Sequence, residues 1–137
     1  MKKILFLDDC EIRHNTFKSK FKIPDTQVEY VYTASKAISA LKNKLYNVVF
    51  LDHDLGGQSF VKSGKNTGYE VALFIATMPA DKRPYQVIIH SHNPVGALNM
   101  KRALQNAVKK LQIIPFSELF LGENKWRTNQ CFCRIDQ

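Results

Sequence analysis

The chain has 137 residues, a length that suits one globular domain. Its residues are 45% hydrophobic and 23% charged, which are ordinary proportions for a water-soluble protein and exclude a disordered or fibrous one. No apolar run reaches the ~18 residues that cross a bilayer. The apolar run at 4–7 ends at Asp8 and Asp9 and is too short for a secretory signal, so we expect a cytoplasmic protein.

The formal net charge of +8 at pH 7 favours anionic partners. We expect a phosphate-containing small molecule or a nucleic-acid end as the partner and no membrane, and the sequence leaves the oligomeric state open. Lysine and arginine are scattered rather than clustered, which is also typical of a solvated surface. The cysteines, Cys10, Cys131 and Cys133, have an odd count and a spacing that fit neither a disulfide framework nor a four-ligand zinc site.

Short apolar runs alternate with amphipathic stretches along the chain. In chain order, the pattern predicts a strand at 4–7, a helix at 11–21, a strand at 28–32, a helix at 34–44, a strand at 48–51, a helix at 69–78, a strand at 85–89, a helix at 94–111 and a strand at 112–114. This alternation is typical of a parallel sheet with helices on both faces. A loop rich in Gly, Ser, Lys and Asn separates the third strand from the third helix.

Helical spacing and capping residues predict which side chains face the core. Thr33 and Asn93 are the predicted N-caps of the second and fourth helices. In the first helix we expect Ile12, Phe17 and Phe21 to point inward and His14 to lie on the surface. The predicted inward residues of the last helix are Val95, Leu98, Ala103, Leu104, Ala107, Val108 and Leu111.

The fold class is therefore α/β, a doubly wound domain over residues 1–137. Its core covers 1–116, and an irregular extension covers 117–137. Within the extension we expect a helical turn at 117–121 and a short strand at 131–135. In such sheets ligands bind beyond the carboxyl ends of the strands, where the strand order reverses.

Three predicted strand ends are followed by side chains that can carry chemistry. They are Asp8 and Asp9 after the first strand, Asp52, His53 and Asp54 after the third, and His90, Ser91, His92 and Asn93 after the fourth. Carboxylates placed this close repel one another, and a bound cation relieves the repulsion. Mg²⁺ prefers carboxylate oxygen, whereas imidazole nitrogen favours Zn²⁺, Mn²⁺ or Fe²⁺.

Plainer explanations exist for the same residues. Asp8 or Asp9 can cap the first helix, because Asp is a good N-cap. His53 can be a surface histidine with its own partners, and one of His90 and His92 can serve packing alone. Asn93 fits a helix cap better than a ligand, although the helix that it starts would aim backbone N–H groups at a phosphate.

Asp8 and Asp9 after an apolar strand, Asp52 after the third strand and Ser91 after the fourth resemble the response-regulator receiver domain over residues 1–116. The resemblance implies a flavodoxin-like sheet of five strands in the order 2-1-3-4-5. It further implies that Asp8 and Asp9 bind Mg²⁺ and that Asp52 accepts a phosphoryl group or is a third ligand. The backbone carbonyl near Asp54 would be another ligand, and Ser91 would contact the phosphoryl group.

The sequence departs from ordinary receivers in three ways, one of which is a longer loop after Asp54. Ile114 precedes Pro115 where receivers have a lysine that clamps phosphate, and histidines stand near the predicted site. A narrower resemblance, to the cyclic-phosphate-processing receiver family, is the better match. Four strings carry it: Phe6-Leu7-Asp8-Asp9, Leu51-Asp52-His53-Asp54-Leu55-Gly56-Gly57, Thr67-Gly68-Tyr69-Glu70-Val71-Ala72 and His90-Ser91-His92-Asn93-Pro94-Val95-Gly96-Ala97.

The leading hypothesis is a metal-dependent phosphoesterase that acts on a cyclic nucleotide or a terminal cyclic phosphate of a nucleic acid. Mg²⁺ is the expected ion, with Mn²⁺ and Zn²⁺ as alternatives. The metal residues are Asp8, Asp9, Asp52 and Asp54; the catalytic residues are His90, His92, Ser91 and His53; the phosphate-binding residues are Ser91, Asn93, Val95 and Gly96. One alternative is a non-catalytic module that binds a nucleotide or a protein. The other is a receiver phosphorylated on Asp52.

Overall fold

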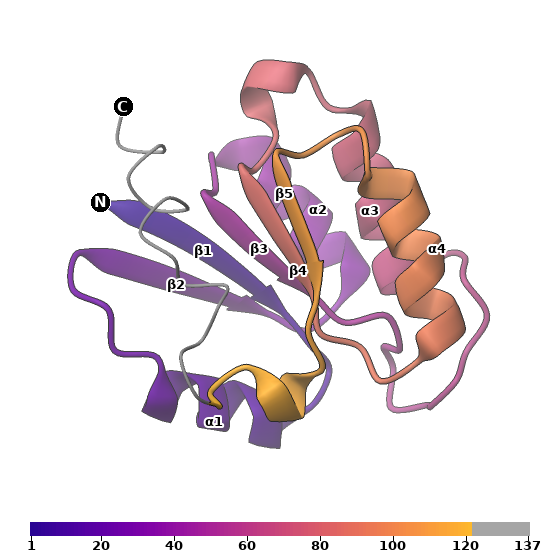
Figure 1. Cartoon of the computed structure of the whole chain (residues 1–137), viewed down its shortest axis with the longest axis horizontal. Helices are drawn as coiled ribbons and strands as arrows, with labels where there is room; N and C mark the ends of the chain where they lie inside the picture. The colour runs from indigo at the N-terminus through magenta and orange to yellow at the C-terminus, as the bar shows by residue number, and fades with distance from the viewer. Residues whose placement is uncertain (122–137) are drawn as a thin grey trace.

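Five parallel strands form the central sheet, in the order β2-β1-β3-β4-β5 that the receiver resemblance implies (Figure 1). The computed structural model describes residues 1–121. The strands are β1 (Lys2–Leu7), β2 (Thr26–Val31), β3 (Val48–Leu51), β4 (Gln86–Ile89) and β5 (Lys110–Ile113). The helices are α1 (Glu11–Lys20), α2 (Ala34–Asn43), α3 (Gly68–Thr77) and α4 (Pro94–Leu104), with two short 3-10 helices, η1 (Ala80–Lys82) and η2 (Phe116–Glu118).

An apolar cluster lies on each face of the sheet. Leu5 and Val49 pack against α2, α3 and α4 on one face, whereas Ile4 and Phe6 pack against α1 and the segment around η2 on the other (Figure 1). Successive side chains of a strand point to opposite faces, so a strand covered on both sides must be apolar at every position. This is why the predicted run at 48–51 is buried along its whole length.

The packed face of α1 differs from the predicted one. Phe17 and Phe21 are buried as predicted, but Ile12 is 75% exposed and His14 is fully buried. The His14 ring bonds through Nε2 to the backbone oxygen of Asp8 at 2.7 Å. The predictions of an inward Ile12 and a surface His14 are wrong because a backbone partner makes the imidazole a good core side chain.

The N-cap predictions for α2 and α4 are confirmed. The Thr33 hydroxyl accepts a hydrogen bond from the amide of Lys36 at 3.2 Å, and the Asn93 side chain accepts one from the amide of Gly96 at 3.0 Å. The alternative that Asp8 or Asp9 caps α1 is wrong. Cys10 holds the N-cap position there, and no side-chain cap bond is present in this described part of the chain.

Helix α4 ends at Leu104, earlier than predicted, and β5 begins earlier to match. The strand starts at Lys110 because this residue pairs with Gln86 of β4. The apolar residues Ala107 and Val108 continue the helical spacing past Leu104. They pack against the core from the turn and bend that follow α4, not from the helix. Val95 and Leu98 are exposed rather than inward, since the buried face consists of Gly96, Ala97, Met100 and Leu104.

The region after β5 is described only up to residue 121. The predicted helical turn at 117–121 is a 3-10 helix, η2, that begins one residue earlier. The predicted strand at 131–135 lies outside the described residues, so the division into core and extension stays a prediction. Within residues 1–121, no helix is long and apolar enough to cross a membrane.

Gly68 joins the first turn of α3 to the carboxyl end of β3. Its amide donates to the backbone oxygen of His53 at 2.9 Å. A Cβ added at Gly68 would overlap the backbone oxygen of Asp52, so only glycine allows this approach. Helix α3 therefore fixes the backbone on which the Asp52 side chain stands.

We expect Gly68→Ala to lower the free energy of unfolding by about 3 kcal/mol, because α3 and β3 must move apart. Gly64→Ala is the matched control, since a Cβ there meets nothing within 4 Å. For the control we expect a change within about 0.5 kcal/mol. Urea denaturation measures both variants, and equal losses of stability would contradict the close approach at Gly68.

Candidate functional site

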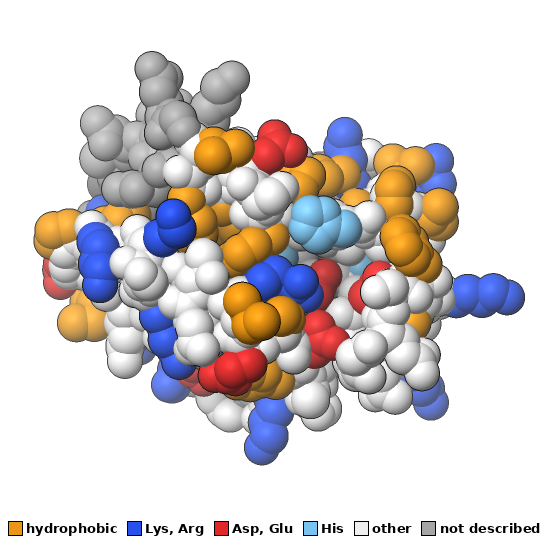
Figure 2. All heavy atoms as spheres, turned by 90° about the horizontal axis from the view of Figure 1, so that it is seen from below, with side chains coloured by type: hydrophobic (Ala, Val, Ile, Leu, Met, Phe, Trp, Pro, Cys, Tyr) orange, Lys and Arg blue, Asp and Glu red, His pale blue; other side chains and the backbone are white. Residues whose placement is uncertain are grey.

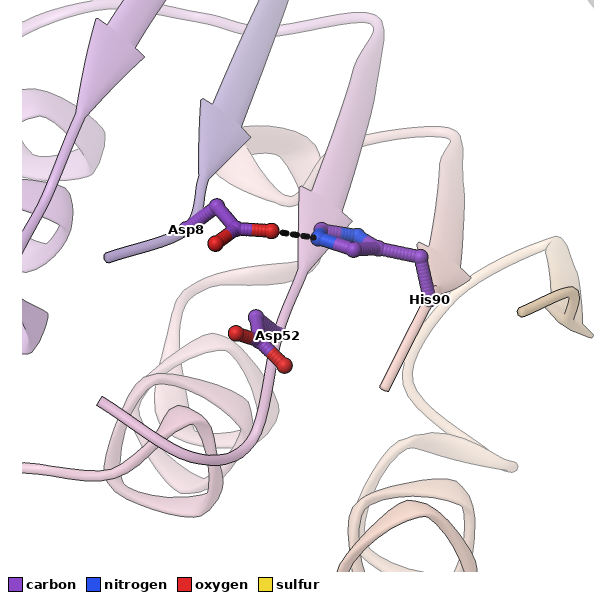
Figure 3. A group of neighbouring side chains, drawn as sticks. All are labelled: Asp8, Asp52 and His90. Carbon is purple, nitrogen blue, oxygen red and sulfur yellow. Dashed lines mark hydrogen bonds and ion pairs between the residues drawn. The ribbon is translucent and has the colours of Figure 1, made fainter. Parts of the chain in front are cut away.

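The carboxyl ends of β1, β3 and β4 bring three of the predicted residues together. The hydrogen-bond ladder continues past the strands, because the amide of Asp52 donates to the backbone oxygen of Leu7 at 3.1 Å and the amide of His90 to that of Leu51 at 3.0 Å. Asp8, Asp52 and His90 therefore lie side by side, with one ligand atom from each within 4.8 Å of the others (Figure 3).

Asp8 is fully buried and is held from two sides. Arg13 donates to both of its oxygens, from Nε at 2.6 Å and from Nη2 at 2.8 Å, and His90 Nε2 lies 2.9 Å from Oδ2. Burial favours the neutral carboxyl, but the hydrogen bonds from His90 and Arg13 outweigh it and hold the pKa of Asp8 well below its usual range. Asp8 is therefore a carboxylate at neutral pH.

His90 lies beneath the site rather than on its surface. Only 1% of it is exposed, and its ring stacks on Phe6 with the centroids 5.0 Å apart. Burial lowers the pKa of His90, so the neutral ring donates its Nε2–H to Asp8. Among residues 1–121, Nδ1 of His90 has no hydrogen-bond partner. This environment suits a residue that orients Asp8 or binds a metal, and the predicted acid–base role stays a prediction.

Arg13, which the sequence analysis does not single out, supplies the positive charge of the site. Besides its two bonds to Asp8, Nη2 lies 3.5 Å from Oδ2 of Asp52 and 3.6 Å from Oδ1 of Asp9. One guanidinium thus contacts three carboxylates. The available sequence signal was an arginine four residues after the acidic pair, in the first turns of α1.

Asp52 is the carboxyl group whose protonation relieves this crowding of negative charge. Burial, followed by the charge of Asp8, raises the pKa of Asp52 to about 8 despite the attraction of Arg13. The amide of His53 donates to Oδ1 of Asp52 at 2.9 Å. Without a further cation, Asp52 is mostly protonated at pH 7, and Oδ2 is the oxygen on the Arg13 side.

The loop after β3 holds Asp9 at the rim. The amide of Gly57 donates to Oδ2 of Asp9 at 2.6 Å. Gly56 and Gly57 have φ values of 85° and 82°, a left-handed conformation that glycine adopts at low cost. The two glycines therefore turn the loop back onto the end of β1.

His53 and Asp54 belong to a second hydrogen-bond network, at the start of α4. The buried His53 ring lies 2.8 Å from Oδ1 of Asp54 through Nδ1 and 2.8 Å from the Ser63 hydroxyl through Nε2. Asn93 Nδ2 donates to Oδ1 of Asp54 at 3.0 Å, and the amide of Phe60 donates to Oδ2 at 2.6 Å. The surface alternative for His53 is wrong, and the ligand and catalytic roles of both residues stay predictions.

The residues predicted to bind phosphate are already hydrogen-bonded to one another and to the loop after β3, where Asn93 Nδ2 also donates to the backbone oxygen of Val61 at 3.1 Å. The amide of Asn93 donates to the Ser91 hydroxyl at 3.0 Å, and the amide of Gly96 is taken by the Asn93 side chain. Ser91 and Asn93 are buried, whereas Val95 is exposed. These bonds are those of a helix cap, the plainer explanation for Asn93, and the phosphate-binding role stays a prediction.

A pocket of about 390 Å³ opens over the acidic cluster. Its lining includes Asp9, Asp52, Asp54, Arg13 and His92. Figure 2 shows acidic, basic and histidine side chains gathered near the middle of this face. Of the predicted histidines, His92 is the one that lines this pocket.

The donor set fits a divalent cation. Asp8 and Asp52 offer carboxylate oxygens, and Asp9 adds an oxygen at the rim. His90 can offer Nε2 as well, in the tautomer that carries its proton on Nδ1 and in place of its hydrogen bond to Asp8. Oxygen donors suit Mg²⁺ or Mn²⁺, and a nitrogen donor shifts the preference toward Mn²⁺ or Zn²⁺. Such an ion would also offset the like charges that raise the pKa of Asp52.

The sequence profile of the family described as "Cyclic-phosphate processing Receiver domain" matches residues 3–106. The chain belongs to this family. The match contains all three strand ends that form the site. No curated protein matches the chain.

This receiver domain also shares its fold with solved response regulators. The phosphorylated cyanobacterial phytochrome response regulator RcpA is 20% identical, with a TM-score of 0.64 and coverage of 87% of this chain and 86% of that one. TrrA from Thermotoga maritima, in complex with Mg²⁺–BeF, is 17% identical, with a TM-score of 0.60 and coverage of 99% and 97%. The response regulator domain of Thermotoga maritima CheB is 17% identical, with a TM-score of 0.63 and coverage of 100% and 98%. At these identities the likeness concerns the fold.

With a chelator present, we expect Asp52→Asn to stabilise the receiver domain, increasingly so from pH 4 to pH 8. The pKa of Asp52 rises on folding from 3.8 to about 8, so the folded state loses stability as pH rises through this range. The gain should be on the order of 5 kcal/mol at pH 8 and about 0.5 kcal/mol at pH 4. Urea denaturation at a series of pH values measures it.

Asp8→Asn is the matched comparison and should have the opposite sign. The pKa of Asp8 falls on folding, so its charge stabilises the folded state above the ordinary pKa of 3.8, and this stability is lost as pH falls below that value. We expect a loss of about 3 kcal/mol at pH 7, because Arg13 and His90 lose a charged acceptor. A stabilised Asp8→Asn, or a destabilised Asp52→Asn at pH 8, would contradict this distribution of charge.

Proposed function

We propose that this receiver domain binds a divalent cation at Asp8, Asp9 and Asp52 and accepts a phosphoryl group on Asp52. The observation that carries the proposal is the place of Asp52, which directly follows the central strand β3, lies beside Asp8 and borders the pocket. The similar structures of RcpA and TrrA, phosphorylated and in complex with Mg²⁺–BeF respectively, support this choice.

The residues of the chain divide the work. A bound cation would supply positive charge to the carboxylates and to the phosphoryl oxygens. The amide of His53 holds Oδ1 of Asp52, which leaves Oδ2 on the side of Arg13, a residue that borders the pocket. As a carboxylate, Asp52 attacks the phosphorus of a small phosphodonor through Oδ2; a P–O or P–N bond to the donor breaks, and the leaving group keeps the electron pair.

Incubation with phosphoramidate and Mg²⁺ is expected to add one phosphoryl group to the intact protein. The pKa of Asp52 is raised to about 8, so this carboxyl group ionises poorly without a cation. Phosphoryl addition should therefore fall about tenfold when EDTA replaces Mg²⁺. Mass spectrometry of the intact protein and of its peptides measures the extent and position of the adduct.

Two variants control this experiment. Asp52→Asn should take up no phosphoryl group, whereas Asp81→Asn, which changes an exposed acid in η1, should react like the wild type. An adduct on another residue, or equal addition with EDTA, would rule out Asp52 as a cation-dependent acceptor.

Two observations favour a second activity, the hydrolysis of a cyclic phosphate. His92 is exposed in the pocket that Asp52 borders, and the family description names cyclic-phosphate processing. In this proposal water adds to phosphorus, a ring P–O bond breaks, Asp52 takes the proton of the water and His92 gives one to the departing alkoxide. The substrate is a cyclic nucleotide or a nucleic-acid end, which the net charge of +8 favours.

A panel of cyclic nucleotides and RNA ends with a cyclic phosphate, offered with Mg²⁺, Mn²⁺ or Zn²⁺, tests this activity. We expect His92→Gln to lower kcat about 100-fold and Asp52→Asn to abolish turnover, which also excludes a contaminating enzyme. Ser19→Ala, on the exposed side of α1, should leave kcat unchanged. A wild type that cleaves nothing on the panel would refute this second activity and leave the phosphoacceptor proposal standing.

A further inference from the structure

We propose that Arg13 is a phosphate-binding residue that the carboxylate cluster holds until a divalent cation releases it. The inference rests on the proposed function, because it concerns the same cation and phosphate site. To the proposed function it adds one residue, Arg13, and the order in which the cation and the phosphate bind. The guanidinium occupies the carboxylates first, the cation takes its place, and the freed guanidinium then binds phosphoryl oxygens in the pocket.

Arg13 occupies the oxygens that a cation needs. Both oxygens of Asp8 accept hydrogen bonds from it, at 2.6 and 2.8 Å, and its Nη2 lies 3.5 Å from Oδ2 of Asp52. Oδ2 of Asp8 also contacts His90 at 2.9 Å. Oδ1 of Asp8 also accepts a hydrogen bond from the amide of Cys10 at 2.8 Å. Each oxygen of Asp8 thus has two partners already, so a cation gains this ligand by exchange with one of them.

Arg13 is the partner that can leave. His90 is 1% exposed and packs against Phe6 and Phe116, so its ring has little room to move. The Arg13 side chain is 30% exposed and borders the pocket. Like charges repel at this range, so a divalent cation bound to Asp8 and Asp52 pushes the guanidinium outward and leaves the neutral His90 in place.

The pocket gives the released guanidinium a ligand. Among the described residues that line it, Arg13 is the one lysine or arginine, and three carboxylates line it too. A phosphate that enters would meet this negative charge, so it needs a cationic hydrogen-bond donor from the protein. The guanidinium presents paired N–H groups that match two phosphate oxygens.

Titration calorimetry with Mg²⁺ tests the exchange in three full-length proteins. We expect Arg13→Gln to bind Mg²⁺ on the order of tenfold more tightly than the wild type, because the competitor is gone. Lys20→Gln removes the same charge from an exposed position at the end of α1 and should change the affinity by less than about twofold.

Inorganic phosphate, titrated at saturating Mg²⁺, tests the second half of the inference. Arg13→Gln should bind phosphate on the order of tenfold more weakly than the wild type, even though it binds Mg²⁺ more tightly. Arg13→Lys should fall between them, because it keeps the charge and loses the planar pair of donors. These opposite changes in affinity separate a phosphate ligand from a residue that only supports the fold.

NMR spectroscopy of the wild type provides an independent measurement, which holds even where a variant fails to fold. In ¹⁵N-labelled protein, the Nε–H of Arg13 is bonded to Asp8 and should exchange slowly with water. Mg²⁺ should shift this resonance and speed its exchange, and phosphate added next should slow the exchange again. Thermal unfolding of each variant confirms that it is folded.

The outcomes separate this inference from the proposed function. The role of Arg13 is overturned if the wild type binds Mg²⁺ and Arg13→Gln binds it equally or more weakly. It is also overturned if Arg13→Gln keeps the phosphate affinity of the wild type, or if Mg²⁺ does not move the Arg13 resonance. Each of these outcomes leaves the cation site in place. If Arg13→Gln binds Mg²⁺ and the wild type does not, the result supports the exchange, with Arg13 as a competitor that Mg²⁺ alone does not displace. No Mg²⁺ binding by either protein contradicts the proposed function, and this inference with it.

Discussion

Two carboxyl groups on neighbouring strand ends set the constraint on which the site depends. Asp8 and Asp52 follow Leu7 and Leu51, which pair in register between β1 and β3, so strand pairing itself places them side by side. Two buried like charges at this distance destabilise the fold unless a cation or a proton intervenes. The structure uses both: Asp8 stays charged against Arg13, whereas the pKa of Asp52 rises to about 8.

The residues of this edge were predictable from the sequence, but their partners were not. Carboxyl ends of parallel strands meet, so acids and histidines after three strands had to gather. Spacing does not say which way each side chain turns. His90 supports Asp8, His53 joins the loop after β3 to α4, and His92 borders the pocket. The place of Arg13 was not predictable from spacing, because it depends on a side chain that reaches back across the first turn of α1 to Asp8.

The fold was more predictable than the site, because strands and caps are encoded locally. The unbroken apolar run of β3 predicts a buried strand, and Thr33 predicts a helix N-cap; neither depends on distant residues. The errors arose where distant partners decide. His14 is buried because a backbone oxygen of the rim satisfies it, and α4 stops at Leu104 because the following residues must reach the register that pairs Lys110 with β4.

The two proposed chemistries require the same geometry and differ in what reaches the phosphorus. The residue before Pro115 is Ile114, so the end of β5 gives no lysine to the pocket, and Arg13 approaches from α1 instead. If Asp52 attacks, the product is an acyl phosphate whose lifetime depends on access of water. If water attacks, Asp52 serves as its base. His92 is exposed and lines the same pocket as Asp52, so in either proposal it would be the histidine that meets the ligand. The competition between carboxylate and water would then decide whether a phosphoryl group is stored or turned over.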